Sequence, residues 1–221
     1  MQKLLDLDTT KLFFGTPFQQ RNGLKIVPMS IVDGRFDYDS YLRFQVGNNQ
    51  NDMVHSQYGM STPMPGANPD RRNMDITVSE EMIAKIRELE AKVVDHFSAN
   101  SQEIFKSPTL NRELSSILKT TPTGATVMKV KVAVVGDRKC AVRVLESPTT
   151  CVLKDADALG RNIDLLGIVD SPGVWYDNSR FGVSLTMQSA LVRPPAGGGG
   201  SIRGLGAFNL EPGLAEGPDS M

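Results

Sequence analysis

Hydrophobic and polar residues alternate with a period of two through much of this chain, which predicts a mainly β protein. In the first half, the alternation is clearest where Leu42, Phe44 and Val46 interleave with Tyr41, Arg43 and Gln45. Strands are expected there over residues 11–14, 24–32 and 41–46. In the second half they are expected over residues 126–135, 140–145, 163–169 and 181–192, with the turn at 136–139 joining the first two as a hairpin.

The most informative β-type segment is the one that closes the chain, residues 173–192. It holds the only tryptophan, Trp175, beside Tyr176, and a polar turn at 177–180 followed by Phe181. Such a turn reverses a strand, so an antiparallel hairpin is predicted. Because successive side chains of a strand point to opposite faces, one ring of the Trp175–Tyr176 pair is expected to be accessible.

Between the two β-rich halves, the apolar period changes to that of a helix. Residues 79–98 carry one apolar stripe, Ser79 is a suitable N-cap, and Glu80 and Glu81 suit the first turn. A weaker helix is expected over 109–119. Residues 47–75 are polar and rich in Asn, Met and Pro, which predicts a long loop.

This order of strands, one long helix and further strands fits an OB-like barrel with embellishments. A β-sandwich carrying one helix fits nearly as well. We expect one domain over residues 1–193, followed by a flexible, Gly/Pro-rich and mildly acidic tail over 194–221. That tail is interpreted either as a disordered terminus or as a tethered peptide that docks on a partner or on the domain's own basic groove.

Composition narrows the class of protein. The chain is 40% hydrophobic and 22% charged, which is ordinary for a soluble globular protein. A net charge of −1 and a pI near 6.1 argue against bulk attraction to nucleic acid or membrane, but they allow a local basic face. The cysteines, Cys140 and Cys151, are expected to be reduced thiols in an intracellular setting, with a disulfide left open. No apolar run reaches the length of a membrane helix.

The sequence contains few of the motifs that mark enzymes. His55 and His96 are the only histidines, and no metal-ligand cluster or nucleophile elbow occurs. The stretch Asp170-Ser171-Pro172-Gly173 is similar to the magnesium-contacting loop of GTPases, but the phosphate-binding P-loop that must accompany it is missing. We therefore expect no catalysis, no cofactor and no metal.

Nucleic-acid binding has more support. Rings that could stack on bases are Trp175, Tyr176 and Phe181, with Phe44 and Tyr41 as further candidates, and cations that could contact phosphates are Lys129, Lys131, Arg138, Lys139, Arg143 and Arg180. Trp175 could equally be a core residue, and the lysines could be ordinary solvated strand residues.

The motifs Gly173-Val174-Trp175-Tyr176, Arg180-Phe181-Gly182-Val183 and Gln188-Ser189-Ala190-Leu191-Val192 carry a resemblance. Together they resemble the closing hairpin of viral single-stranded DNA-binding proteins, those of large eukaryotic DNA viruses and, in plan, the OB-fold protein of podophages. The resemblance is good over residues 124–192 and loose before them. It implies an OB-fold that binds single-stranded DNA in replication, recombination or repair, with an acidic tail that contacts replication proteins.

The prediction is thus a non-catalytic, sequence-tolerant single-stranded DNA-binding protein of viral type. RNA binding and homo-oligomers stay open, no membrane is expected, and the site of action would be the host nucleus or a cytoplasmic replication site. The alternative is a structural or adaptor protein, such as a minor virion component, that uses the helix and the tail for protein contacts.

Overall fold

The computed structural model describes residues 2–21, 23–62, 71–134, 136, 139–147 and 149–194. Its α-helices are α1 (Glu80–Ala99) and α2 (Ser101–Phe105), and short 3-10 turns cover Leu4–Asp6, Thr9–Lys11, Tyr38–Ser40 and Ala156–Ala158. The strands are β1 (Phe13–Phe14), β2 (Phe18–Gln19), β3 (Lys25–Ser30), β4 (Leu42–Val46), β5 (Val54–Ser56), β6 (Arg71–Thr77), β7 (Glu113–Leu114), β8 (Leu118–Thr120), β9 (Thr126–Ala133), β10 (Ala141–Ser147), β11 (Thr150–Lys154), β12 (Ile163–Ser171), β13 (Gly173–Tyr176), β14 (Arg180–Val183) and β15 (Thr186–Arg193).

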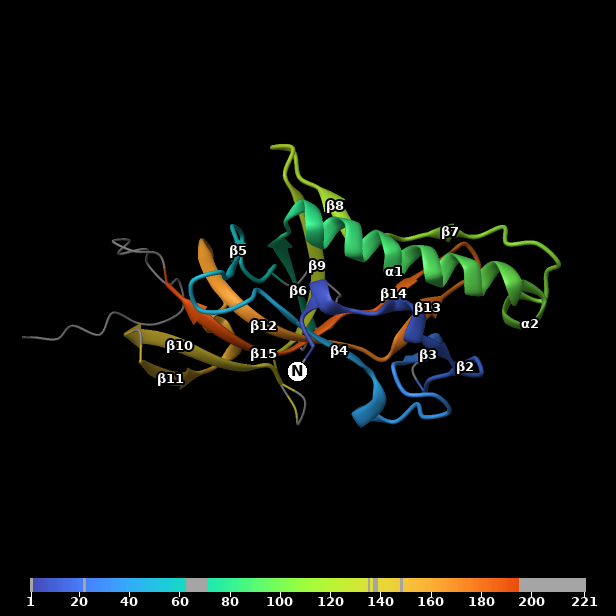
Figure 1. The fold of residues 1–221 in the computed structure, drawn as a ribbon, viewed down its shortest axis with the longest axis horizontal. Helices are drawn as coiled ribbons and strands as arrows, with labels where there is room; N and C mark the ends of the chain where they lie inside the picture. Colours follow the sequence, from blue (N-terminus) through green and yellow to red (C-terminus); the bar gives the residue numbers. More distant parts are fainter. Residues whose placement is uncertain are drawn as a thin grey trace, which may run out of the picture.

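Two sheets share one long hairpin (Figure 1). The smaller sheet has the order β1-β3-β13-β14-β7, with β2 on β3, and the larger has the order β11-β10-β15-β12-β4, with β5 on β12 and β6, β9 and β8 attached through β15. Strand β12 leads into β13, and β14 leads into β15, so residues 163–193 form a single bent hairpin, called here the long hairpin. The protein is mainly β with one long helix, and its curled sheets are consistent with the predicted OB-like fold.

Helix α1 lies over one face of the smaller sheet (Figure 1). Ser79 caps it, since its Oγ accepts a hydrogen bond from the Met82 amide at 3.3 Å. Near the other end, the Phe97 ring stacks on Phe181 of β14, with 4.7 Å between centroids and 12° between planes. Tyr176 meets the same Phe97 ring edge-on at 6.2 Å. The predicted helix is confirmed, and these rings join it to the long hairpin.

The second helix predicted over residues 109–119 is wrong. The segment is extended and forms β7 and β8 instead. Its backbone is held by Glu90 of α1, a buried carboxylate that accepts a hydrogen bond from the Ile117 amide at 2.8 Å and one from Ser116 Oγ at 3.0 Å. This tertiary contact satisfies an amide that a helix would have used internally, so it outweighs the local helix signal.

The hairpin predicted over residues 126–145 is also wrong. Strands β9 and β10 do not pair with each other within the described residues; both run parallel to β15, β9 beside Thr186–Met187 and β10 beside Ser189–Val192. The chain kinks between them, where the Cys140 amide donates to the Ala133 carbonyl at 2.8 Å. Strand β10 instead forms its hairpin with β11, which the sequence did not reveal.

The long loop predicted over residues 47–75 is only partly a loop. Strand β5 pairs with β12, and β6 pairs along its whole length with β9. Residues 63–70 lie outside the described part of the chain. The alternation in β6 was hidden by its polar outer residues, which sit on a solvated sheet face.

A β-bulge interrupts the expected alternation of residues 181–192. Val169 of β12 faces Met187, while the preceding Ile168 faces Ser189, so Gln188 is the extra residue. Beyond it the buried positions become Ala190 and Val192. Ser189 and Leu191, which strict alternation from Phe181 would turn towards the core, therefore lie on the other face.

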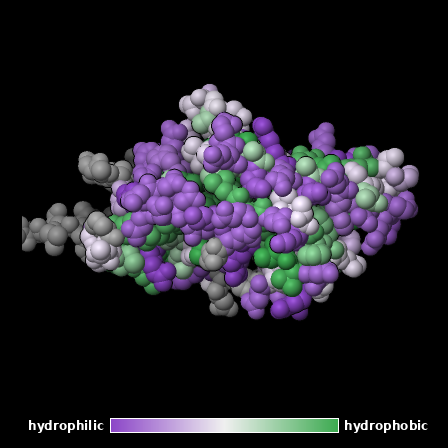
Figure 2. All heavy atoms as spheres, in the orientation of Figure 1, coloured by the Kyte–Doolittle hydropathy of each residue, from purple (hydrophilic) through white to green (hydrophobic). Residues whose placement is uncertain are grey.

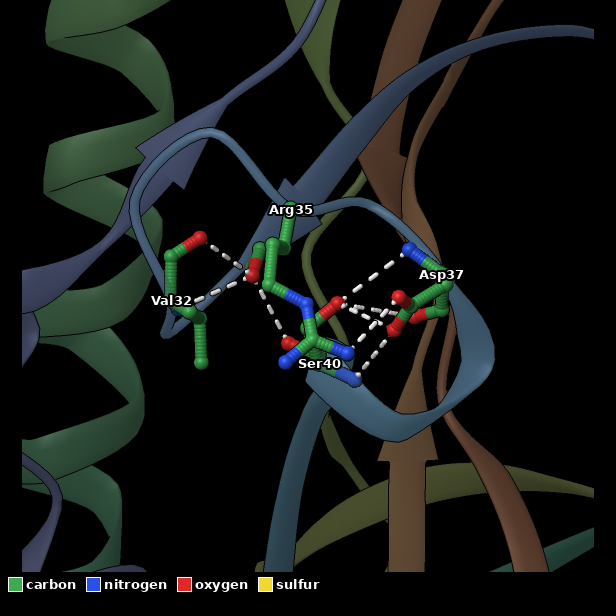
Figure 3. Close-up of polar contacts among 5 residues, drawn as sticks. Val32, Arg35, Asp37 and Ser40 are labelled. Atoms are coloured by element: carbon green, nitrogen blue, oxygen red, sulfur yellow. Dashed lines mark hydrogen bonds and ion pairs between the residues drawn. The ribbon is translucent and has the colours of Figure 1, made fainter.

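The loop from β3 to β4 connects the two sheets and is held by its own polar side chains (Figure 3). Ser30 Oγ donates to the Ser40 carbonyl at 2.8 Å, and Asp37 and Ser40 form a reciprocal capping box. Arg35 lies 2.9 Å from the Asp37 carboxylate. Hydrogen bonds from Ser40 and then from Arg35 lower the pKa of Asp37. This hydrogen-bonded turn leads directly into β4, which begins at Leu42.

Both cysteines are free, Cys140 buried and Cys151 exposed. Burial raises the pKa of the Cys140 thiol to about 12, because the interior disfavours the thiolate.

No helix in the described ranges has the length and apolarity needed to cross a membrane.

Removing the Phe181 ring should destabilise the fold. Phe181→Ala is expected to lose about 3–5 kcal/mol in the free energy of unfolding, because the ring is buried against Phe97. Urea denaturation followed by circular dichroism measures the loss. Arg180→Ala, one position away and exposed, should change it by less than about 0.5 kcal/mol. Equal effects at the two positions would contradict this packing.

The two thiols should react very differently. A thiol raised to a pKa of about 12 carries almost no thiolate at pH 8, and Cys140 is also shielded. One equivalent of Ellman's reagent is therefore expected to react with the native protein and two with the denatured protein. The Cys151→Ser variant should show no fast reaction in the native state, and a fast reaction there would refute the burial of Cys140.

Candidate nucleic-acid interface

The two faces of the long hairpin differ in chemistry. Phe181, Val183, Leu185 and Met187 point into the core, whereas Arg180, Gly182, Ser184 and Thr186 alternate with them on the opposite side. We call this second side, together with the side chains that flank it, the outer face. On the side of the molecule in Figure 2, hydrophilic residues cover most of the surface and hydrophobic ones form separate smaller patches.

Trp175 lies on the outer face at the hairpin's far end. Its Cα partner across the hairpin is Gly182, and a side chain at Gly182 would sit 3.2 Å from indole atoms Cζ2 and Nε1. The indole therefore lies beside the glycine backbone. A Cβ at residue 182 would also lie 2.7 Å from the Ser115 carbonyl oxygen, and this backbone contact is what excludes a residue larger than glycine. Trp175 is half-buried, so part of the ring system remains accessible.

Trp175 continues an apolar row onto the neighbouring strands. Its partner on β3 is Ile26, and the partner of Ile26 on β2 is Phe18. Ile26 is buried, but Phe18 is 48% exposed. Arg180, exposed, follows the turn on the same face. Two partly accessible rings and a cation thus share one end of the outer face.

A polar row crosses the larger sheet next to this group. Register places Lys131 beside Thr186, Thr186 beside Asp170, and Asp170 beside Arg43. The Lys131 ammonium donates to Ser184 Oγ at 3.0 Å, which ties it to the long hairpin. The Arg43 guanidinium donates two hydrogen bonds to the Asp170 carboxylate, of 2.7 and 3.0 Å. Asp170 is only 2% exposed, so Arg43 balances a buried charge.

Further basic residues follow the edge along β15. Lys129 precedes Lys131 by two positions on β9, and Arg143 on β10 stands beside Leu191 of β15. Lys139, exposed, lies in the kink between them and is 3.7 Å from Asp155. Burial, and then the nearby Lys119, lower the pKa of Lys129. Strands β9 and β10 thus place Lys131 beside Thr186 and Arg143 beside Leu191, along the same edge of β15.

The aromatic half of the predicted site needs correction. Phe44 is fully buried, Phe181 is 1% exposed and Tyr176 is 8% exposed. All three point into the core, and the prediction that they are accessible to bases is wrong for Phe44 and Phe181. Tyr176 exposes only a small part of its ring. Tyr41 is half-buried and lies two positions before Arg43, so it is on the outer face. Arg138 falls outside the described residues.

Sequence reasoning missed Phe18 and Arg43. Phe18 sits in a two-residue strand with no periodic pattern around it, so nothing in the sequence indicated an outward ring. Arg43 was placed correctly on the polar side of residues 41–46, but its partner Asp170 is 127 residues away. A contact of that range leaves no signal in a single sequence.

The described residues contain no group of three or more His, Cys, Asp and Glu side chains that could hold a metal ion. His96 stacks on Phe14 at 4.1 Å, and burial lowers its pKa. His55 Nδ1 lies 2.9 Å from Asp164 at the surface. The two histidines therefore lie on different elements and each has its own structural contact.

Comparison with protein-family models and with curated proteins finds no match. Among solved structures, the chain is similar to the single-stranded DNA-binding protein from bacteriophage Enc34 in complex with ssDNA, at 10% identity and a TM-score of 0.44, over 81% of this chain and 95% of that one. It is also similar to gp2.5, a single-stranded DNA-binding protein encoded by bacteriophage T7, at 17% identity and a TM-score of 0.43, over 70% and 92%.

Both neighbours are phage single-stranded DNA-binding proteins, the class that the closing hairpin resembles. The likeness is distant at these identities and at TM-scores below 0.5, and it assigns no role to any residue of this chain.

The Arg43–Asp170 pair should contribute to stability. Arg43→Met leaves a buried carboxylate without its guanidinium, so a loss of about 3 kcal/mol in the free energy of unfolding is expected. The double variant Arg43→Met/Asp170→Leu removes both charges and should regain part of that loss. Chemical denaturation of the wild type, the single variant and the double variant measures both steps. A double variant less stable than the single one would contradict the role given to Arg43.

Proposed function

We propose that this protein is a non-catalytic, sequence-tolerant single-stranded DNA-binding protein that acts in viral DNA replication, recombination or repair. One observation carries the proposal: accessible rings and cations from distant parts of the sequence share the outer face of the long hairpin. Trp175, Phe18 and Tyr41 supply the rings, and Lys129, Lys131, Arg143 and Arg180 supply the cations.

The face has the dimensions of a single-strand site. Strands rise by about 3.3 Å per residue, so the run from Arg180 to Arg193 extends roughly 40 Å. OB-folds that bind single strands cover about 4–16 nucleotides. A strand laid along β14 and β15 would meet Arg180 and Trp175 at one end, Lys131 in the middle and Arg143 towards the other end.

The chemistry of the face favours single strands over particular sequences. Unpaired bases expose their rings, and every base has a flat face on which an indole or phenyl ring can stack. The cations contact phosphates, which are the same at every position. Stacking of this kind contributes about 1–3 kcal/mol of binding free energy per base. Two or three rings therefore supply affinity that a chain of near-neutral net charge does not gain from overall electrostatic attraction.

The finer parts of the function are proposed on the same basis. The ligand is proposed to be DNA, with RNA as the competitor to be tested. The tail over residues 194–221, almost all of it outside the described part, is proposed to contact replication proteins, and the protein is proposed to act inside the host cell. The alternative of a structural or adaptor protein predicts no binding of oligonucleotides.

Titration of Trp175 fluorescence with poly(dT) tests the function, since this chain has one tryptophan. We expect strong quenching that weakens with salt. In Arg143→Gln/Arg180→Gln, the slope of log affinity against log salt should fall by about 1.4, because each lost phosphate contact on a single strand removes about 0.7. Lys92→Gln, on the exposed side of α1, is the matched control and should keep the wild-type slope.

An unchanged Trp175 spectrum, with no complex in a mobility-shift assay, would reject the proposal and favour the adaptor. Equal salt slopes for the double variant and the wild type would instead reject the outer face as the binding surface.

A further inference from the structure

A second concentration of rings and cations lies at the tip of the long hairpin, on the side away from the outer face. It is a pocket of about 330 Å³, bounded by the start of β3, the end of β13 and the end of α2. Its volume falls at the lower end of the range for small-molecule sites. The pocket is lined by Pro17, Lys25, Phe105, Lys106, Arg112 and Tyr176, together with residues 103, 104, 177 and 178.

One wall of the pocket is aromatic. The Phe105 and Tyr176 rings meet edge to face, with 5.5 Å between centroids and 86° between planes. Arg112 covers the Phe105 ring, its guanidinium carbon 4.9 Å from the centroid. The Nε of Arg112 is buried and has no hydrogen-bond partner among the described residues. Nη1 of the same guanidinium donates to Asn111 Oδ1. A buried donor such as Nε without an acceptor is costly, and an anionic ligand seated against Arg112 would satisfy it.

The charge of the lining favours an anion. Lys25 and Lys106 are exposed, and Lys106 ends α2 in the left-handed conformation at φ 57°. Of the acidic residues, Asp177 is engaged in the hairpin turn, where its Oδ1 accepts from the Ser179 and Arg180 amides, each at 2.7 Å. Glu103 is exposed on α2. Three cations therefore face two carboxylates, one of which is already occupied.

The pocket adjoins the outer face at the hairpin tip. Asp177 and Asn178 line the pocket, and two residues later Arg180 belongs to the outer face. On the neighbouring strand, Pro17 lines the pocket and the next residue, Phe18, is part of the aromatic row. A strand that follows the outer face to Arg180 can thus reach the pocket by rounding the turn.

We propose that this pocket binds one nucleotide of the bound single strand, with its phosphate on Lys25, Lys106 and Arg112 and its base or sugar against Phe105 and Tyr176. This inference rests on the proposed function. It adds a discrete nucleotide receptor, formed by α2 and the hairpin tip, to the open surface along the hairpin.

The first test uses thymidine 5′-monophosphate as the probe, with NMR amide shifts of the full-length protein as the readout. Shifts are expected at Phe105, Lys106, Tyr176 and Asn178. Thymidine alone and inorganic phosphate alone should bind more weakly, because each makes only part of the contacts. Shifts confined to the outer face, or equal affinity for phosphate and the nucleotide, would overturn the proposal.

Two variants then test the residues. In Arg112→Gln/Lys106→Asn the affinity for thymidine 5′-monophosphate should fall about a hundredfold, since two contacts are lost and each hydrogen bond to a charged group contributes about one decade of affinity. Asn tolerates the left-handed backbone at position 106, so folding should be preserved. Arg112→Lys keeps the charge but loses the planar contact with Phe105, and an intermediate affinity is expected. Lys92→Gln is the control.

The same variants separate the bound strand from a free nucleotide. Weaker binding of a dT oligonucleotide by the double variant supports the proposal. Loss of mononucleotide binding with unchanged oligonucleotide binding would assign the pocket to free nucleotides and overturn its role in strand binding. Wild-type protein that binds no oligonucleotide at all would reject the proposed function itself, an outcome that Trp175 fluorescence distinguishes.

Discussion

The contact between Phe97 and Phe181 sets the geometry on which the outer face depends. With the Phe181 ring stacked on the helix, alternation along β14 forces Arg180 and Gly182 to the opposite side. Gly182 in turn leaves room for the indole of Trp175. The burial of the Phe181 ring therefore determines on which side of the hairpin the Trp175 ring lies. The same strand alternation sets both the packing of the core and the side chains of the outer face.

Much of the fold could be predicted from the sequence wherever local pattern and tertiary environment agree. The long helix has a cap, a favourable first turn and an apolar stripe, and the closing hairpin has a polar turn between alternating strands; both are present. Residues 109–119 were misjudged because Glu90, distant in the chain, fixes the Ile117 amide. The pairing of β9 was misjudged because two of its partners, the antiparallel β6 and the parallel β15, lie far from it in the chain, so no connecting turn marks them.

The candidate site likewise contains residues whose position could be predicted from the sequence and residues whose position could not. Lys129, Lys131 and Arg143 lie on the less buried sides of their strands, as the alternation of β9 and β10 predicted, although the two strands do not pair with each other. Aromatic residues carry no such constraint: Trp175 and Tyr176 had to be on opposite faces, but the sequence did not say which face was the core. The pocket at the hairpin tip was beyond prediction, since Lys25, Arg112 and Tyr176 come from three separate segments that only the fold brings together.

The bulge at Gln188 has a consequence for how this strand can evolve. Deleting Gln188 would place Ser189 directly after Met187, so strict alternation would return and Ala190 and Val192 would still face the core. Deleting Ser189 as well would place Ala190 directly after Met187 and turn Ala190 and Val192 towards solvent. The strand can therefore lose one residue at this point, but not two, and keep its core face.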